Sequence, residues 1–192
     1  MGRNRSFDGE AVLTGAMHAF RRAGYASLSI RDLEQATGLS SGSLYNAYGN
    51  KDGLFRAAFD HYVETIIRAR LDAFAGPTAT LDMLEQLFLT LWQAPQTDGH
   101  GCLMINTMVE GGEARAIVSG SIDAASQLLR TRMEQVLARA IGAEAAVLET
   151  DRLLLLYHGI LVLSRGGRLA TSYAEIVTSE FQRLRMPRGT AH

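Results

Sequence analysis

The stretch Ser29-Ile-Arg-Asp-Leu-Glu-Gln-Ala-Thr-Gly-Leu-Ser-Ser-Gly-Ser-Leu-Tyr-Asn-Ala-Tyr-Gly-Asn-Lys51 decides the fold. It predicts two short helices joined by a tight turn. Ser29 can cap the first helix, with Asp32 three residues later as in a capping box. Gly38 can take the positive φ that ends a helix, and one of the serines at 40 and 41 can cap the second. This is the helix-turn-helix plan, whose second helix enters the DNA major groove.

The same spacing also fits an ordinary helical corner in a protein that does not bind DNA. The wider sequence separates the two interpretations. The segments Leu28-Ser-Ile-Arg-Asp-Leu33, Ala36-Thr-Gly-Leu-Ser-Ser-Gly-Ser-Leu-Tyr45 and Tyr48-Gly-Asn-Lys-Asp-Gly-Leu-Phe55 closely resemble the DNA-binding domain of TetR-family transcriptional regulators. The resemblance runs from about Glu10 to Phe59. Beyond residue 60 only the length and the helical pattern resemble the family, apart from a weaker echo at Gly101-Cys-Leu-Met-Ile-Asn106.

The resemblance implies DNA contacts at eight positions of this chain. They are Ile30, Arg31, Ser41, Gly42, Tyr45, Asn46, Ala47 and Lys51. Tyr45 can donate to a phosphate, Lys51 lies at a helix start facing the DNA backbone, and Asn46 can pair with adenine through its amide. The family often has an aromatic residue or a histidine where this chain has Asn46 and Ala47, so the resemblance does not fix the base preference.

Basic side chains outnumber acidic ones only in the N-terminal part of the chain. The 192 residues carry a formal net charge of −1. Residues 1–51 hold six basic and four acidic side chains, and the remainder holds 13 basic and 16 acidic ones. The N-terminal part therefore has an excess of +2 and the rest −3, which weakly favours DNA contact at the N-terminal end.

Location and membrane association are also predicted from composition. The single cysteine excludes an internal disulfide and fits a reducing cytoplasm. The first 20 residues contain no continuous apolar run of the kind that a signal peptide needs. The longest apolar run, Leu153–Leu163, is 11 residues long, whereas a membrane span needs about 20. We expect a cytoplasmic protein without membrane contact.

The remaining pattern has helical periodicity throughout, which predicts an all-α fold. Expected helices run from Lys51 to about Ala75, from Thr80 or Asp82 to Trp92, over Cys102–Glu110, over Glu113–Ile141 (which Gly120 can divide), over Arg152–Arg165 and onward from Ser172. We expect a helix-turn-helix DNA-binding domain at residues 1–50. A helical bundle for ligand binding and dimerisation follows at 51–192, with helix 51–75 linking the two.

The last two helices predict a homodimer. Apolar side chains cover nearly the whole circumference of the helix from Arg152, so one face needs a second partner. The helix from Ser172 adds Tyr173, Val177, Phe181 and Leu184. Around a two-fold axis these helices form a four-helix contact. A deeply buried helix in a monomer is the alternative.

The central helices predict a pocket for an apolar or aromatic small-molecule effector. Its candidate lining is Met83, Leu87, Phe88, Leu91, Trp92, Met104, Met108 and Tyr157. Methionine adapts to irregular shapes, and Trp and Tyr add a polar group to an apolar wall. Ordinary core packing is the alternative for each residue.

Cys102 follows Gly101 at the expected start of a short helix. A helix N-terminus favours the thiolate, which would lower the pKa and make Cys102 a redox or covalent sensor. Some relatives with the same Gly-Cys-Leu pattern resemble sensors of electrophiles or oxidants. The alternative is packing as a small apolar residue, because Leu103, Met104 and Ile105 place it against a core.

Enzyme chemistry is not expected. The five histidines share no motif with a carboxylate or a serine, and His100 with Cys102 gives too few ligands for a zinc site. We expect no metal and no cofactor. The sequence predicts a ligand-responsive repressor that binds an inverted-repeat DNA operator as a homodimer and releases it on binding a small molecule. The alternatives are a helical ligand-binding bundle without DNA function and a helix-turn-helix protein of another family.

Overall fold

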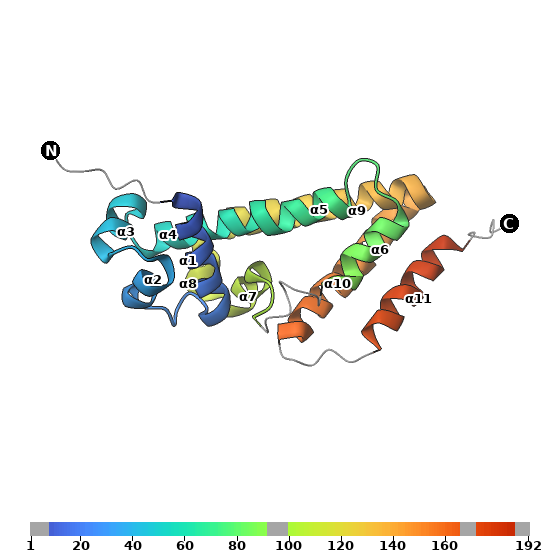
Figure 1. Cartoon of the computed structure of the whole chain (residues 1–192). Helices are drawn as coiled ribbons and strands as arrows, with labels where there is room; N and C mark the ends of the chain where they lie inside the picture. Colours follow the sequence, from blue (N-terminus) through green and yellow to red (C-terminus); the bar gives the residue numbers. More distant parts are fainter. Residues whose placement is uncertain (1–7, 92–99, 166–171, 187–192) are drawn as a thin grey trace. The chain divides into compact units, whose positions relative to one another are not determined.

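The computed structural model describes residues 8–91, 100–165 and 172–186 (Figure 1). Within these ranges every regular element is a helix, which confirms the all-α fold class. The chain divides into two compact units. The first runs to Ile66 and takes in Cys102–Asp123, and the second contains Ile67–Gly101 and the residues from Ala124 onward. The compact units therefore do not coincide with the two domains that the sequence predicts at 1–50 and 51–192.

The first unit is built around an aromatic core. Its helices are α1 (Gly9–Ala23), α2 (Ile30–Thr37), α3 (Ser41–Tyr48), α4 (Lys51–Tyr62), α7 (Leu103–Glu110) and α8 (Gly112–Ile117). The ring of Phe55 lies 4.7 Å from that of Phe20 and 6.2 Å from that of Phe59, and all three are buried. Helices as short as α2 and α3 are not stable alone in water. Packing of α1 on α2 and of α4 on α3 holds them in place.

Four of these helices begin at residue types that favour the N-cap position. The side chain of Asp8 accepts backbone N–H groups at the start of α1. Ser29 and Asp32 form the predicted capping box of α2. Of the two serines considered for α3, Ser40 is the cap, and Asn50 caps α4. These local contacts satisfy N–H groups that the helices leave without a partner, so they fix where each helix starts.

The helical spacing of apolar residues in the three N-terminal helices predicts a small core, which is confirmed only in part. The predicted residues are Leu13, Phe20, Ile30, Leu33, Leu39, Leu44 and Tyr48. Phe20, Leu33 and Leu44 are buried, whereas Leu13, Ile30, Leu39 and Tyr48 are partly exposed. In the first turn of α1, Val12 is buried in place of the predicted Leu13. Tyr25, which the sequence places only in a connection, is a core residue.

The long helix predicted over 51–75 forms as three consecutive helical segments. After α4 come a π-helical segment, Val63–Arg68, and then α5 (Ala69–Phe74). A π-helical turn closes hydrogen bonds one residue further apart than an α-helix and is wider. The border between the two compact units, Ile66 to Ile67, falls inside this segment.

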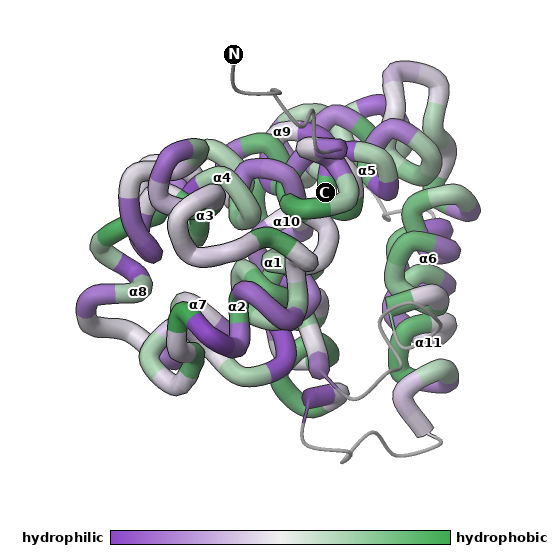
Figure 2. The backbone as a smooth tube through the Cα atoms, turned by 60° about the vertical axis from the view of Figure 1, so that its left-hand side comes forward, coloured by the Kyte–Doolittle hydropathy of each residue, from purple (hydrophilic) through white to green (hydrophobic). Residues whose placement is uncertain are grey.

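The second unit contains α5, α6 (Leu81–Leu89), most of α9 (Ser119–Ile141), α10 (Ala143–Arg165) and α11 (Tyr173–Arg185). Helices α6 and α11 run side by side with apolar residues along both (Figure 2). The ring of Phe88 lies 5.4 Å from that of Phe181 and 5.7 Å from that of Tyr157. Arg185 joins the same two helices through Asp82 and Glu85.

Two predicted helix boundaries are wrong. Helix α10 starts at Ala143 rather than near Arg152, because Gly142, with a φ of 89°, separates it from α9. The break between α8 and α9 lies at Val118 and not at Gly120. None of the described helices is long and apolar enough to cross a membrane.

Candidate nucleic-acid interface

Side chains fix the turn between α2 and α3. The hydroxyl of Thr37 donates to the carbonyl of Leu33 at 2.6 Å and accepts the N–H of Leu39 at 3.3 Å. Across the turn, the carboxylate of Glu34 accepts the backbone N–H of Ser41. That bond ties the first turn of α3 to α2 and satisfies one of its free N–H groups. The two helices therefore form one rigid helix-turn-helix.

Helix α3 has one buried apolar anchor and an exposed outer face. Leu44 is buried against the unit. Gly42, Asn46 and Ala47 are exposed, and Tyr45 is 47% exposed. An exposed aromatic side chain beside an amide, on the second helix of this motif, is positioned to contact a partner surface.

The other predicted DNA-contact residues flank α3. Ser41 is half-buried at its start. Arg31 is exposed and Ile30 is half-buried in the first turn of α2. Lys51 is half-buried in the first turn of α4. All eight predicted residues lie on three consecutive helices of one unit, and their contact with DNA stays a prediction.

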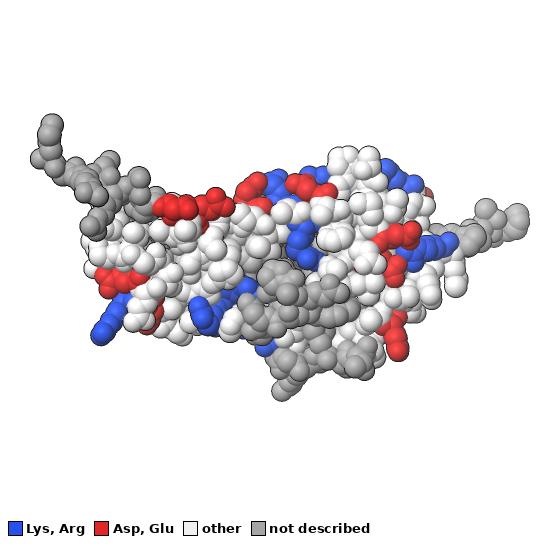
Figure 3. Space-filling view, in the orientation of Figure 1, with Lys and Arg blue, Asp and Glu red and all other residues white. Residues whose placement is uncertain are grey.

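On the face that Figure 3 displays, basic and acidic side chains are interspersed.

Two glycines let the backbones of neighbouring helices touch. A Cβ atom at Gly15 of α1 would lie 2.2 Å from the carbonyl oxygen of Ala36, at the end of α2. A Cβ atom at Gly53 of α4 would lie 2.0 Å from the carbonyl oxygen of Tyr48, at the end of α3. No side chain fits at these distances. The two glycines therefore set how closely α2 and α3 pack on the helices that carry them.

Tyr25 adds a contact to Lys51 that sequence reasoning missed. The ammonium of Lys51 lies 4.3 Å from the centre of the Tyr25 ring. The Tyr25 hydroxyl donates to Asp52 at 2.5 Å. Burial and this hydrogen bond both raise the pKa of the Tyr25 phenol, so the phenol stays protonated and continues to donate. The missed signal was an aromatic residue directly after the glycine that ends α1.

Cys102 directly precedes α7, close to the predicted helix start. Its pKa is expected from the sequence to be lowered, and this expectation is wrong. The side chain is buried, and no side-chain cap is made there. Burial raises the pKa of the Cys102 thiol, while weaker opposing contributions come from a hydrogen bond with Tyr62 and from the backbone of α7. The free-energy cost of removing a thiolate from water exceeds the stabilisation that the helix N-terminus gives to the thiolate. Packing therefore accounts for Cys102 better than sensing does.

We expect the native protein to react slowly at Cys102. A chromogenic disulfide reagent should modify the thiol at least about tenfold more slowly in the folded protein than in urea, because burial disfavours the thiolate. Cys102→Ser supplies the background rate. Equal rates in the two states, or DNA release by the reagent from wild type but not from Cys102→Ser, would instead make this thiol a sensor.

The structure does not bring the predicted effector lining together in one unit. Leu87, Phe88, Leu91 and Tyr157 are buried in the second unit, and Met83 there is exposed. Met104 and Met108 belong to the first unit. Trp92 lies outside the described residues. The lining stays a prediction.

Within the described ranges, no group of three or more His, Cys, Asp or Glu side chains could hold a metal ion. The pair His100 and Cys102 gains no further ligand there.

An N-capped pair of short helices, with a fixed turn and an exposed second helix, defines the helix-turn-helix class of DNA-binding domains. Residues 12–58 match the family model described as bacterial regulatory proteins of the tetR family. The match covers most of α1, all of α2 and α3, and most of α4.

Relatives extend the comparison. The chain is 33% identical over 108 residues to the HTH-type transcriptional repressor ComR of Escherichia coli, covering 55% of this chain and 51% of ComR. It is 31% identical over 113 residues to the HTH-type regulator YezE of Bacillus subtilis, covering 57% of this chain and 58% of YezE. The alignments thus span about half the length of these relatives.

Solved structures match over nearly the whole chain. A cysteine mutant of the TetR-family regulator CifR, complexed with 26-bp double-strand operator DNA, is 25% identical with a TM-score of 0.76. The match covers 94% of this chain and 98% of that one. A TetR regulator from Legionella pneumophila, 17% identical with a TM-score of 0.78 and coverage of 94% and 98%, shares the fold. Residues 12–58 are thus similar to the DNA-binding domain of TetR-family regulators, and the chain shares the fold of solved members of that family.

Proposed function

We propose that the protein is a repressor that binds an inverted-repeat operator as a homodimer and releases it on binding a small molecule. The observation that carries the DNA contact is the exposed outer face of α3, held in place by the buried Leu44. A DNA-reading helix needs this arrangement, because only a rigidly held helix can present the same side chains to successive base edges.

The side chains around α3 divide into two roles. Arg31, Tyr45 and Lys51 carry cationic or phenolic donors, which suit phosphate oxygens and fix the position of the domain. Asn46 and Ser41 can donate to and accept from base edges and so carry the sequence preference. Asn46 is the stronger reader, because its amide pairs with adenine at two atoms.

A row of exposed apolar residues on α10 supports the homodimer. Leu148, Leu155 and Val162 follow at intervals of seven, so they line one side of the helix. Leu155 is 76% exposed. Single exposed leucines are common, but a continuous row marks an interaction surface. A second copy with the same row, related by a two-fold axis, would cover it.

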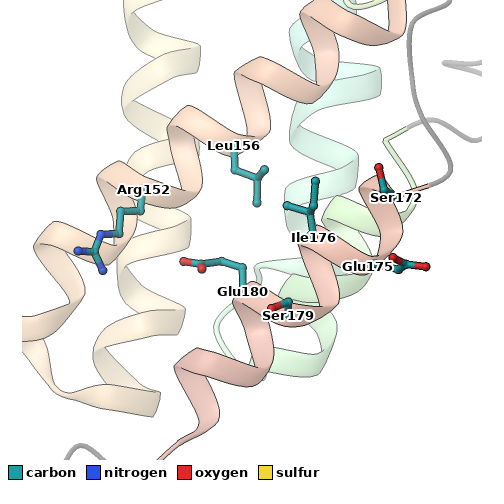
Figure 4. Close-up of a pocket in the computed structure, with 7 residues that line it drawn as sticks. All are labelled: Arg152, Leu156, Ser172, Glu175, Ile176, Ser179 and Glu180. Carbon is teal, nitrogen blue, oxygen red and sulfur yellow. The ribbon is translucent and has the colours of Figure 1, made fainter.

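The adjoining helix completes this surface. A hollow of about 510 Å³ lies between α10 and α11, with Leu156 and Ile176 pointing into it (Figure 4). Arg183 on α11 joins Glu149 of α10 and lies 2.6 Å from Glu180. Because Glu149 is buried, this ion pair fixes the two helices to each other. A rigid pair of helices with apolar residues outside suits a four-helix dimer contact.

An aromatic wall in the second unit supports an apolar or aromatic effector. Phe88, Tyr157 and Phe181 form this cluster. An effector shifts a regulator only if it binds the DNA-free state more tightly than the DNA-bound state. The coupling is reciprocal, so operator DNA must weaken effector binding by the same factor.

The decisive experiment is operator binding measured by fluorescence anisotropy. DNA from the region upstream of the coding sequence should bind, and the protected site should be an inverted repeat. Replacing Tyr45 or Lys51 by Ala should weaken binding to every sequence, about tenfold or less for each lost phosphate contact at moderate salt. Replacing Asn46 by Ala should instead flatten the preference at one base pair per half-site, by about 1–3 kcal/mol.

A scrambled duplex of the same length and composition is the control for that experiment. Equal affinity of the wild type for the scrambled duplex and for every upstream fragment would contradict the proposal. It would favour a helical ligand-binding bundle without DNA function.

A further inference from the structure

The side chain of Lys51 packs against the ring of a buried tyrosine, Tyr25. The ring of Tyr25 packs against Phe20 and Phe55, with centroid distances of 6.2 Å and 5.0 Å. The Lys51 ammonium lies over the Tyr25 ring, and the Tyr25 hydroxyl donates a hydrogen bond to Asp52. The tyrosine thus binds both charged side chains of the first turn of α4.

Helix α7 fixes the backbone that carries this tyrosine. The carboxylate of Glu110 accepts the N–H of Tyr25 at 3.1 Å with one oxygen and the N–H of Ala26 at 2.9 Å with the other. One helical turn earlier, the buried amide of Asn106 donates to the carbonyl of Arg21 at 3.1 Å. Two side chains on one face of α7 therefore hold the end of α1 and the connection that follows it.

We propose that Tyr25 and Glu110 are positioning residues for DNA binding. They act by holding the Lys51 ammonium in the position in which it contacts a DNA phosphate. The inference rests on the proposed function, in which Lys51 contacts the DNA backbone. Neither residue touches DNA in this scheme.

The physical reason lies in the freedom of a lysine side chain. A lysine has many rotamers, and ordering them on binding costs free energy. The attraction between an ammonium and an aromatic ring limits those rotamers before DNA arrives. The neighbouring carboxylate of Asp52 would compete with phosphate for the same ammonium. Its hydrogen bond with the Tyr25 hydroxyl occupies one oxygen of that carboxylate and so weakens the competition.

Glu110→Gln tests the inference with little change in shape. The glutamine keeps one acceptor but places an NH₂ group against a backbone N–H, so the paired contact to Tyr25 and Ala26 is lost. Glu113→Gln is the matched control, because Glu113 is exposed on α8 and loses the same charge. Tyr25→Phe is the second variant and removes only the hydroxyl. Operator affinity is measured at several salt concentrations, with thermal unfolding to verify folding.

We expect Glu110→Gln and Tyr25→Phe each to weaken operator binding about fivefold, and Glu113→Gln to match wild type. The slope of log affinity against log salt should fall by up to about one, as for loss of one phosphate contact. In a Lys51→Ala background, Glu110→Gln should have no further effect, because the residue through which it acts is gone.

Two results would overturn the inference. One is equal affinity of Glu110→Gln, Tyr25→Phe and wild type. The other is the full loss persisting in the Lys51→Ala background, which would make the contact merely structural. If wild type binds no operator, the proposed function fails and the inference fails with it. If wild type binds and the variants behave like it, only the inference fails.

Discussion

Leu155→Glu is expected to make the protein monomeric and to weaken operator binding by about 100-fold or more. The residue lies in the middle of the exposed row on α10. In a two-fold contact each carboxylate would face the partner's apolar row, and burying an unpaired charge is strongly unfavourable. Two linked reading heads bind with an avidity of about 10²–10⁴ over one head, and a monomer loses that gain.

Light scattering at micromolar concentration measures the mass, and anisotropy measures the affinity. Val109→Glu is the matched control for mass. Val109 is also an exposed apolar residue, on α7 and outside the row on α10. The control should keep the mass of a dimer. A dimeric Leu155→Glu protein with wild-type affinity would show that the copies associate through another surface.

Gly53→Ala is expected to lower the free energy of unfolding by about 2 kcal/mol, as for an overpacked core site. The added Cβ would meet the Tyr48 carbonyl oxygen at 2.0 Å. A carbonyl oxygen of the backbone cannot rotate away, so the end of α3 must move away from α4. Because α3 is the proposed reading helix, operator affinity should fall at least about tenfold with it.

Gly120→Ala provides a control with the same chemical change. Gly120 lies within α9, and no atom would come within 4 Å of its Cβ. Alanine is the better helix former, so this variant should be at least as stable as wild type. Urea unfolding gives both values. If Gly53→Ala is as stable as wild type and binds the operator equally, the close approach of α3 and α4 does not set the reading helix.

The sequence predicts the helix-turn-helix well because its signals are local. Ser29, Asp32 and Asn50 act within one helical turn of themselves, so the caps are visible in the order of residues alone. The outer face of α3 also follows from a local rule. Leu44 is apolar and packs inward, so the residues just after it, such as Tyr45 and Asn46, lie on other faces of the helix.

The sequence does not predict contacts between residues that are far apart along the chain. Glu110 meets Tyr25 across 85 residues of chain, and no spacing rule connects them. Cys102 shows the opposite case. A local rule for helix termini predicts a lowered thiol pKa, but burial by surrounding side chains outweighs it. The π-helical segment Val63–Arg68 likewise contains no glycine or proline that marks it.

The discontinuous make-up of the first unit limits how its proposed reading helix could be transferred to another protein. Chimeric regulators are simplest to build when a reading head ends at one point in the chain. Here residues 102–123 pack into the same unit as the helices that precede Ile66. A fusion joined at Lys51 or at Ile66 would leave behind α7, with the Glu110 and Asn106 contacts to the end of α1. A graft that transfers operator specificity intact must carry both pieces, or change only the exposed residues of α3.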